Sequence, residues 1–189
     1  MSGVNSESYD LVIAGLGAAG LSLLREVMDA DALRGKRILA IDRDPTPKPD
    51  KTWCFWARPG HPVTRLADHS WPGLEVIADR RHHAKRLEGY RYYCASSESY
   101  ATAILERARA SDRGTLLASS VRGFHMGGDH VEVETDAGSH RAEWCFQSSI
   151  RPDPLRVAGG EIRLLQHFVG WEIRTERPVF NPERALLMD

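Results

Sequence analysis

Tyr9-Asp-Leu-Val-Ile-Ala-Gly-Leu-Gly-Ala-Ala-Gly20 is a short apolar strand that leads directly into three glycines. The spacing G-x-G-x-x-G after a strand is typical of Rossmann-type turns that bind a dinucleotide diphosphate. Gly15 would allow the tight turn, Gly17 the close approach of the diphosphate, and Gly20 the close packing of the next helix. We expect the backbone of this loop, including Ala18, to meet the diphosphate with the positive end of that helix.

The residues after the loop support the same site. Apolar side chains recur at helical spacing at Leu21, Leu24 and Met28. A second apolar strand is expected over residues 37–42, and it ends in Asp42, 22 positions after Gly20. An acid there can accept hydrogen bonds from an adenosine ribose. It favours an unphosphorylated ribose, although the neighbouring Arg43 leaves a phosphorylated one open.

Composition limits the partners and the compartment. Of 189 residues 42% are hydrophobic, and the net charge of −1 gives no electrostatic reason to expect nucleic acid. No apolar run approaches the roughly 20 residues that cross a bilayer, and the N-terminus lacks a signal pattern. We therefore expect a cytoplasmic protein. Cys54, Cys94 and Cys145 are too widely separated to indicate a disulfide framework or a metal site, and we expect buried free thiols.

The order of elements beyond Asp42 indicates which dinucleotide is bound. Residues 43–93 contain six prolines and are too long for an ordinary connection, so we predict a functional insertion with short elements of its own. A helix is expected over 97–111, followed by a β-meander. The meander's predicted strands cover 115–118, 121–126, 130–135 and 140–146. This is the order of FAD domains of the glutathione-reductase type, and it points to FAD more than to NAD.

The C-terminal residues are expected to begin a second unit. A linker with two Pro and two Gly residues follows residue 150, and strands are predicted over 163–175 and 184–188. Such a short segment leaves too little apolar area for an independent core. We therefore expect an α/β, Rossmann-like FAD/NAD(P)-binding domain over 1–150 and an incomplete second domain over 151–189.

Three segments together resemble the lycopene cyclase family. They are the loop over 15–20, the stretch Lys51-Thr-Trp-Cys-Phe-Trp56, and the run Leu165-Gln-His-Phe-Val-Gly-Trp171 with Leu187-Met-Asp189. The resemblance extends from about residue 9 to the end, and it corresponds to the N-terminal half of the family's usual length. It implies that the second unit starts a substrate domain built on an antiparallel sheet.

The resemblance implies a flavoprotein that converts the linear ends of lycopene into β-ionone rings without net redox change. In the family, reduced FAD is required and NADPH is the usual electron source. The acyclic end is protonated to a carbocation, which an anionic reduced flavin is well suited to stabilise. The family's glutamate-rich catalytic motif belongs to the other half, and Gln147 stands where related sequences usually have an acid. Catalytic residues are therefore expected in a C-terminal half or a second subunit.

Several further positions are candidates for ligand contacts. Trp53, Phe55 and Trp56 would flank the flavin or line an apolar substrate channel, with core packing of the insertion as an equal alternative. His167 is a candidate for the substrate cavity, although an exposed or hydrogen-bonded histidine is the favoured interpretation. Val121 lies where this fold class often offers backbone hydrogen bonds to adenine.

Residues 80–86, Arg-Arg-His-His-Ala-Lys-Arg, form a dense basic run. Because a carotenoid resides in the bilayer, these cations are candidates for peripheral contact with anionic headgroups, each contributing on the order of 1 kcal/mol. A solvated loop is the favoured interpretation, as an exposed side chain is for Lys51. His82 and His83 would point apart on a strand, so no metal site is predicted.

Two other functions stay open at this point. A flavin oxidoreductase acting on another isoprenoid would have the same fold. A non-catalytic dinucleotide-binding half would instead dock with a second chain. A flavin spectrum, the consumption of NADPH and the need for a second chain separate these possibilities.

Overall fold

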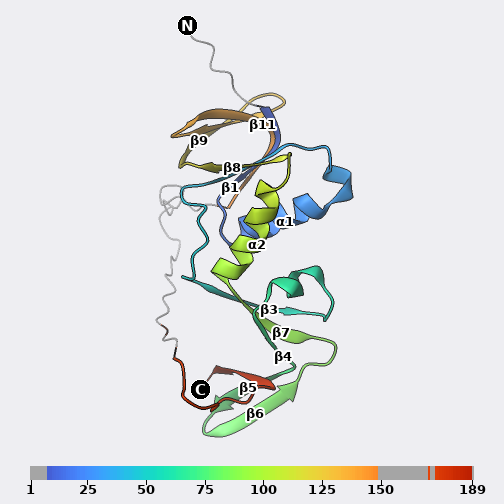
Figure 1. Cartoon of the computed structure of the whole chain (residues 1–189), viewed down its shortest axis with the longest axis vertical. Helices are drawn as coiled ribbons and strands as arrows, with labels where there is room; N and C mark the ends of the chain where they lie inside the picture. Colours follow the sequence, from blue (N-terminus) through green and yellow to red (C-terminus); the bar gives the residue numbers. More distant parts are fainter. Residues whose placement is uncertain (1–7, 149–169, 171–172, 189) are drawn as a thin grey trace, which may run out of the picture.

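The computed structural model describes residues 8–148, 170 and 173–188. Figure 1 shows an elongated molecule with a six-stranded sheet at one end and two small sheets at the other. The helices α1 and α2 lie between them. The six-stranded sheet with α1 and α2 is called the upper unit, and the two three-stranded sheets are called the lower unit.

The upper unit begins with the predicted strand, helix and strand. β1 (Ser8–Ala14), α1 (Ala18–Asp29) and β2 (Ile38–Asp42) follow one another, and β1 pairs in parallel with β2. Val12, Ile13 and Ala14 are fully buried on both faces of the sheet. Such continuous burial is typical of central parallel strands, which are covered on both sides.

The remaining strands complete the sheet in the order β8-β2-β1-β11-β10-β9. After α2 (Ser97–Arg109) come β8 (Gly114–Ala118), β9 (Val121–Met126), β10 (Val131–Thr135) and β11 (Gly138–Gln147). β9, β10 and β11 form the antiparallel meander, and β11 returns parallel to β1. The strand predicted over 115–118 is not part of the meander, because β8 pairs in parallel with β2. The Rossmann-like architecture is therefore confirmed, with element ends shifted by a few residues.

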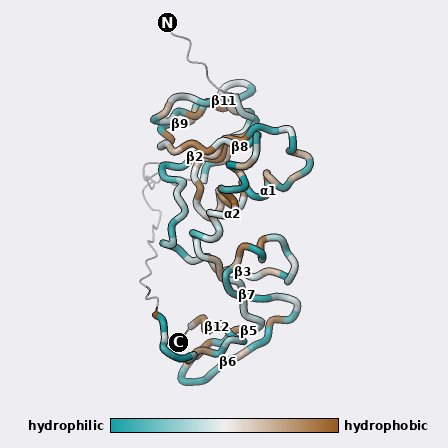
Figure 2. Tube along the Cα trace, viewed as in Figure 1, coloured by the Kyte–Doolittle hydropathy of each residue, from teal (hydrophilic) through white to brown (hydrophobic). Residues whose placement is uncertain are grey.

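Two apolar clusters hold the upper unit together. One lies between the sheet and the helices and includes the buried Leu24, Ile38 and Leu105. The other lies on the opposite face, under the meander, and includes Val12 and Val133. Figure 2 shows hydrophobic segments where β2 and β8 adjoin the helices. Burial on both faces of β1 and β2 makes this unit the main core.

Residues 43–93 supply most of the lower unit. One sheet has the order β3-β7-β4 and is antiparallel, with β3 (Thr52–Ala57), β4 (His69–Trp71) and β7 (Arg91–Ser96). A short 3-10 helix spans Pro62–Leu66. β5 (Gly73–Ala78) and β6 (Arg81–Arg86) form a hairpin. Its turn residues Asp79 and Arg80 both have positive φ, as a two-residue type I′ turn requires.

The C-terminal strand β12 (Arg184–Met188) confirms the strand predicted there, but its partner lies far away in the sequence. β12 pairs in parallel with β5, which gives the sheet order β12-β5-β6. Of the strand predicted over 163–175, residues 173–175 are not in a strand, and most of the rest lie outside the described residues. The edge of the β5–β6 hairpin provides the hydrogen-bonding partner that β12 needs.

Neither α1 nor α2 is both long and apolar enough to span a bilayer, and the described part of the chain has no other helix that is.

Candidate functional site

The glycine loop between β1 and α1 is built around two close backbone contacts. Gly15 has φ of +101°, a conformation that favours glycine, and its N–H donates to the Ile41 carbonyl at 2.7 Å. A Cβ on Gly20 would lie 1.9 Å from the Gly15 carbonyl oxygen. Glycine at 20 therefore lets the first turn of α1 lie directly against the loop.

Gly17 and Ala18 occupy the exposed crest of this loop. A Cβ on Gly17 would meet no atom within 4 Å, so the fold itself does not require glycine there. Gly17 is the N-cap of α1, no side chain caps this helix, and its first turn has no acid. In contrast, Ser96 caps α2, and Glu98 lies in the first turn of α2. The first turn of α1 therefore has backbone N–H groups that no capping side chain accepts from, and such groups suit an anion.

Asp42 ties the end of β2 to the loop. One carboxylate oxygen accepts from the Leu16 N–H at 2.7 Å, and the other accepts from the Asp44 N–H at 3.0 Å. A carboxylate has about four acceptor sites, so Asp42 keeps capacity for ribose hydroxyls. Hydrogen bonds from Lys48 and Thr46 lower the pKa of Asp44 to about 2. A second anion beside Asp42, with Arg43 exposed, favours hydroxyls over a ribose phosphate.

Val121 begins β9 close to the same edge of the sheet. The preceding segment is attached to β2, because the Ser119 N–H donates to the Asp42 carbonyl at 2.9 Å. Ser119 also accepts from the Ala137 N–H through its hydroxyl, at 3.2 Å. The Val121 side chain packs against the cluster under the meander. Its backbone therefore has a fixed position near the Asp42 end of the loop.

The end of β11 adds a residue that the sequence reasoning missed. The Ser148 hydroxyl donates to the Gly15 carbonyl at 2.7 Å, and its N–H donates to Ala14 at 2.8 Å. Gln147 is exposed and lies opposite Ala14 in the parallel register. Because the carboxyl ends of neighbouring parallel strands lie at one edge of a sheet, the residues just after β11 are expected to lie beside the glycine loop.

A cavity of about 520 Å³ starts at the first turn of α1. It is lined by Ala18, Ser22, Thr52, Trp53, Cys54, Phe55, Val63 and Tyr100, and is called the upper cavity. The Trp53 ring meets Tyr100 edge to face at 5.2 Å, and the Tyr100 hydroxyl is 2.8 Å from the Ser22 hydroxyl. Two of the predicted aromatic residues, Trp53 and Phe55, therefore lie beside Ala18.

Trp56 is not part of this cavity. Alternate residues of a strand face opposite sides, so Cys54 and Trp56 point away from the face that Trp53 occupies. The Trp56 side chain is 56% exposed and contacts Tyr92, with ring centroids 5.0 Å apart.

A larger cavity of about 780 Å³ lies between the two small sheets and is called the lower cavity. Its walls are mostly apolar or aromatic, with Trp71, Ile77, Tyr92, Val179, Phe180, Ala185, Leu186 and Leu187. Glu75, His82 and Arg184 add polar groups, and the His82 ring donates to the Glu75 carboxylate at 2.6 Å. Cys54 also lines the upper cavity, so the two cavities adjoin at β3.

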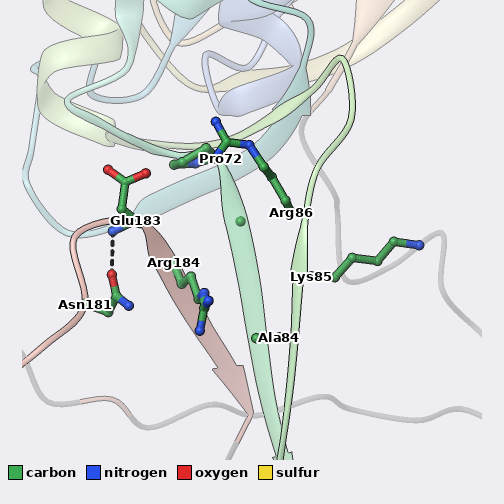
Figure 3. Close-up of a pocket in the computed structure, with 8 residues that line it drawn as sticks. Pro72, Ala84, Lys85, Arg86, Asn181, Glu183 and Arg184 are labelled. Carbon is green, nitrogen blue, oxygen red and sulfur yellow. Dashed lines mark hydrogen bonds between the residues drawn. The ribbon is translucent and has the colours of Figure 1, made fainter.

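The basic run over 80–86 is exposed as expected, but it forms the hairpin turn and strand β6, so the prediction of a loop was wrong. Every residue of β6 is exposed, and a strand without a buried face has no alternating pattern to reveal it. A notch of about 340 Å³ beside it contains Lys85, Arg86, Arg184 and Glu183 (Figure 3). Figure 3 shows Lys85 directed away from the other lining residues. None of the described residues that line the notch has an aromatic or thiol side chain.

The remaining candidates lie elsewhere. His167 is outside the described residues. The Lys51 ammonium donates to Asp50 at 2.7 Å. Among the residues that the structure describes, no group of three His, Cys, Asp or Glu side chains is arranged to hold a metal.

The expectation of buried thiols was wrong for Cys54, which is exposed, while Cys94 and Cys145 are half-buried. Burial raises the pKa of the Cys145 thiol to about 11. Cys54 is exposed because it lies on the face of β3 that borders the lower cavity.

Comparison with known proteins shows the family of the chain. The family model described as lycopene cyclase protein matches residues 10–189, so the chain belongs to the lycopene cyclase family. A search of the curated proteins found no significant match.

Solved structures share the fold at low identity. They include the flavin-dependent brominase Bmp2 (18% identity, TM-score 0.58, 75% of this chain and 38% of that chain). They also include halogenase PltM in complex with phloroglucinol and FAD (17% identity, TM-score 0.57, 80% of this chain and 37% of that chain). A third is p-nitrophenol 4-monooxygenase PnpA from Pseudomonas putida DLL-E4 (16% identity, TM-score 0.56, 75% of this chain and 40% of that chain). The chain thus spans about two fifths of the length of these structures.

Proposed function

We propose that this member of the lycopene cyclase family binds FAD and takes part in converting linear lycopene ends to β-ionone rings. The observation that carries the proposal is the juxtaposition of the upper cavity, with its aromatic side chains, and the uncapped N-terminus of α1. An anion site and an apolar cavity that share Ala18 suit a cofactor with a charged bridge and a planar ring system.

The residues present fit FAD. Backbone N–H groups of Gly17 and Ala18 would receive the diphosphate, Asp42 the adenosine ribose, and the backbone at Val121 the adenine. Gly20 keeps α1 against the loop, since a Cβ there would collide with Gly15. Bound FAD in its reduced form, with NADPH as the electron source, would supply negative charge that stabilises a developing carbocation.

The apolar side chains would hold the polyene and exclude water. Trp53, Phe55 and Tyr100 surround the upper cavity, and the lower cavity continues beyond Cys54 between the small sheets. Water must be kept from a carbocation, because water would add to it before the ring closes. The aromatic faces add cation–π stabilisation of about 0.5–2 kcal/mol. The proton donor would come from a C-terminal half or a second subunit.

The same proposal includes a cytoplasmic protein that touches the membrane at β6. Arg81, Lys85 and Arg86 are exposed on this strand at the end of the molecule farthest from the six-stranded sheet (Figure 1). Cosedimentation with vesicles tests the contact. Binding to anionic but not to neutral vesicles, lost in the variant Arg81→Gln with Lys85→Gln, supports it, and equal binding to both vesicles contradicts it.

The experiment on function uses the purified chain, with and without a separately expressed C-terminal half of a family member. A yellow flavin spectrum is expected in the chain alone. Cyclised product is expected only with reduced flavin, without stoichiometric consumption of NADPH. Trp53→Leu should lower turnover of lycopene while leaving the flavin content unchanged, and Trp56→Leu is the matched control outside the upper cavity.

Two outcomes would favour the other functions. Consumption of one NADPH for each product molecule would indicate a flavin oxidoreductase acting on an isoprenoid. Flavin binding with a cyclisation rate that Trp53→Leu leaves unchanged once a second chain is added would assign this chain to a non-catalytic dinucleotide-binding half. The exposed apolar residues of the lower cavity, Val179, Phe180, Leu186 and Leu187, favour the second possibility over the first.

A further inference from the structure

Cys54 and Cys94 lie directly opposite each other on the antiparallel strands β3 and β7. The Cys94 carbonyl accepts from the Asp68 N–H at 2.9 Å, so it points toward β4 and away from β3. The Ser97 N–H donates to the Lys51 carbonyl at 2.8 Å, three positions along each strand. Since hydrogen-bonded and non-hydrogen-bonded pairs alternate, both observations make Cys54 and Cys94 a non-hydrogen-bonded pair.

This pairing brings the two thiols within reach of each other. In non-hydrogen-bonded pairs the Cα atoms are about 4.5 Å apart, and disulfides join Cα atoms separated by roughly 4.4–6.8 Å. Directly opposite residues also project to the same face of a sheet, with Cβ atoms about 4.5–5.5 Å apart, so the two side chains face each other. A bond between the sulfurs therefore requires no rearrangement of the strands.

The two cysteines differ in access to solvent. Cys54 is exposed and borders both cavities, whereas Cys94 is half-buried. Burial and the adjacent Cys54 raise the pKa of the Cys94 thiol to about 11. Because the thiolate is the reactive form, small oxidants should react first at Cys54.

We propose that Cys54 and Cys94 form a redox-active dithiol, which hydroperoxides oxidise to a cross-strand disulfide. The Cys54 thiolate attacks the peroxide, the O–O bond breaks, and the departing oxygen takes a proton, which leaves a sulfenic acid on Cys54. The Cys94 sulfur then attacks the Cys54 sulfur, the S–O bond breaks, and water leaves. The thiols lose two protons and two electrons, which reduce the peroxide to water and an alcohol, or to two waters.

The disulfide would change the wall between the two cavities. It would bind the exposed thiol of Cys54, on the face of β3 that borders the lower cavity, to Cys94. In a reducing cytoplasm such a bond is transient and reports the level of oxidant. The inference does not depend on FAD or on lycopene, because it requires only the pairing of β3 with β7.

The test is thiol counting on the full chain after treatment with hydrogen peroxide near equimolar amounts. The reduced protein has three cysteines, so three thiols should react with a thiol reagent after denaturation. One thiol is expected after oxidation, and dithiothreitol should restore all three. Digestion without reductant should yield a linked peptide containing Cys54 and Cys94, which mass spectrometry identifies.

Single variants separate this pair from general oxidation. Cys145→Ser is the matched control and should still lose two thiols, whereas Cys54→Ser should lose none. In Cys94→Ser and Cys94→Ala, dimedone should label Cys54, because no second thiol resolves the sulfenic acid. Retention of all three thiols in the native chain, or a linkage through Cys145, overturns the proposal.

Discussion

The upper and lower units are both mainly β-sheet, but they bury their apolar residues differently. The large side chains that are fully buried, such as Ile13, Leu24 and Leu105, all belong to β1, α1, β2, α2 and β10 of the upper unit. In the lower unit Trp56 and Phe180 are more than half exposed, and Phe180 borders the lower cavity. Met126 and Trp144 of the upper unit are also exposed, but they lie on the meander strands β9 and β11 and line none of these cavities among the described residues. The upper unit can therefore hold a loop rigidly, while the lower unit offers apolar surface to a ligand or a partner.

The largest effect should come from the core of the upper unit. Leu24 is fully buried between α1 and the sheet, so Leu24→Ala should lower the free energy of unfolding by about 2–5 kcal/mol. Trp56→Ala should change it by less than about 1 kcal/mol, because more than half of that side chain is exposed. Urea unfolding measures both, and equal losses would remove the distinction between the units.

Gly20 should be the next most sensitive position. A Cβ there meets the Gly15 carbonyl at 1.9 Å, so Gly20→Ala must displace backbone and should cost about 1–3 kcal/mol. A Cβ on Gly35 would meet no atom within 4 Å, so Gly35→Ala is the matched control within the same unit. If both variants unfold at the wild-type urea concentration, the close contact of α1 with the loop is wrong.

Asp42→Asn should act on the ligand more than on the fold. The amide can still accept from Leu16, but it loses the charge that strengthens hydrogen bonds to ribose hydroxyls. We expect affinity for FAD to fall about tenfold, or about 1.4 kcal/mol, by fluorescence titration. Arg43→Gln, at the exposed neighbour, should leave affinity near the wild-type value, and a larger loss there would indicate a phosphorylated ribose.

The smallest effects concern one carboxylate in each unit. Hydrogen bonds from Lys36 and from the Arg37 N–H lower the pKa of Asp10 in the upper unit, and the Ser96 N–H lowers that of Asp68 in the lower unit. A carboxyl group whose pKa is lowered by folding stabilises the fold at pH values above its unfolded-state pKa, near 3.8. This contribution to the free energy of unfolding is lost as the pH falls below that pKa. Asp10→Asn and Asp68→Asn should each flatten the fall in stability below about pH 4.

Salt should distinguish these two carboxylates. The partner of Asp10 is the ammonium of Lys36 at 2.8 Å, which salt screens, whereas Asp68 accepts from a backbone N–H at 2.6 Å. High salt should therefore weaken the contribution of Asp10 to the free energy of unfolding more than that of Asp68. Urea unfolding at low and high salt measures both contributions. An equal salt response at both sites would contradict these assignments.

The sequence predicted the parts of the upper unit whose signals are local. Gly15, Gly20 and Asp42 follow one another along one strand, helix and strand, so spacing alone revealed them. The contact of Ser148 with Gly15 and the pairing of Cys54 with Cys94 depend on strand register across long separations. No local pattern encodes that register.

The lower unit was harder to predict for a second reason. β6 is exposed along its whole length, so it lacks the alternation that identifies a strand. β12 has the composition of a strand, but its parallel pairing with β5 joins segments about a hundred residues apart. The apolar surface of the lower cavity emerges only once these strands are brought together.

Retention of FAD by Gly17→Val, compared with Gly35→Val, decides whether the N-terminus of α1 receives the diphosphate. Both positions have open space for a Cβ, so both variants should keep the circular dichroism spectrum and urea midpoint of the wild type within small differences. Gly17→Val should lose the flavin absorbance during purification and Gly35→Val should keep it, because only the side chain at position 17 would occupy the path of the diphosphate. Wild-type flavin content in a folded Gly17→Val protein would contradict a diphosphate site at this loop.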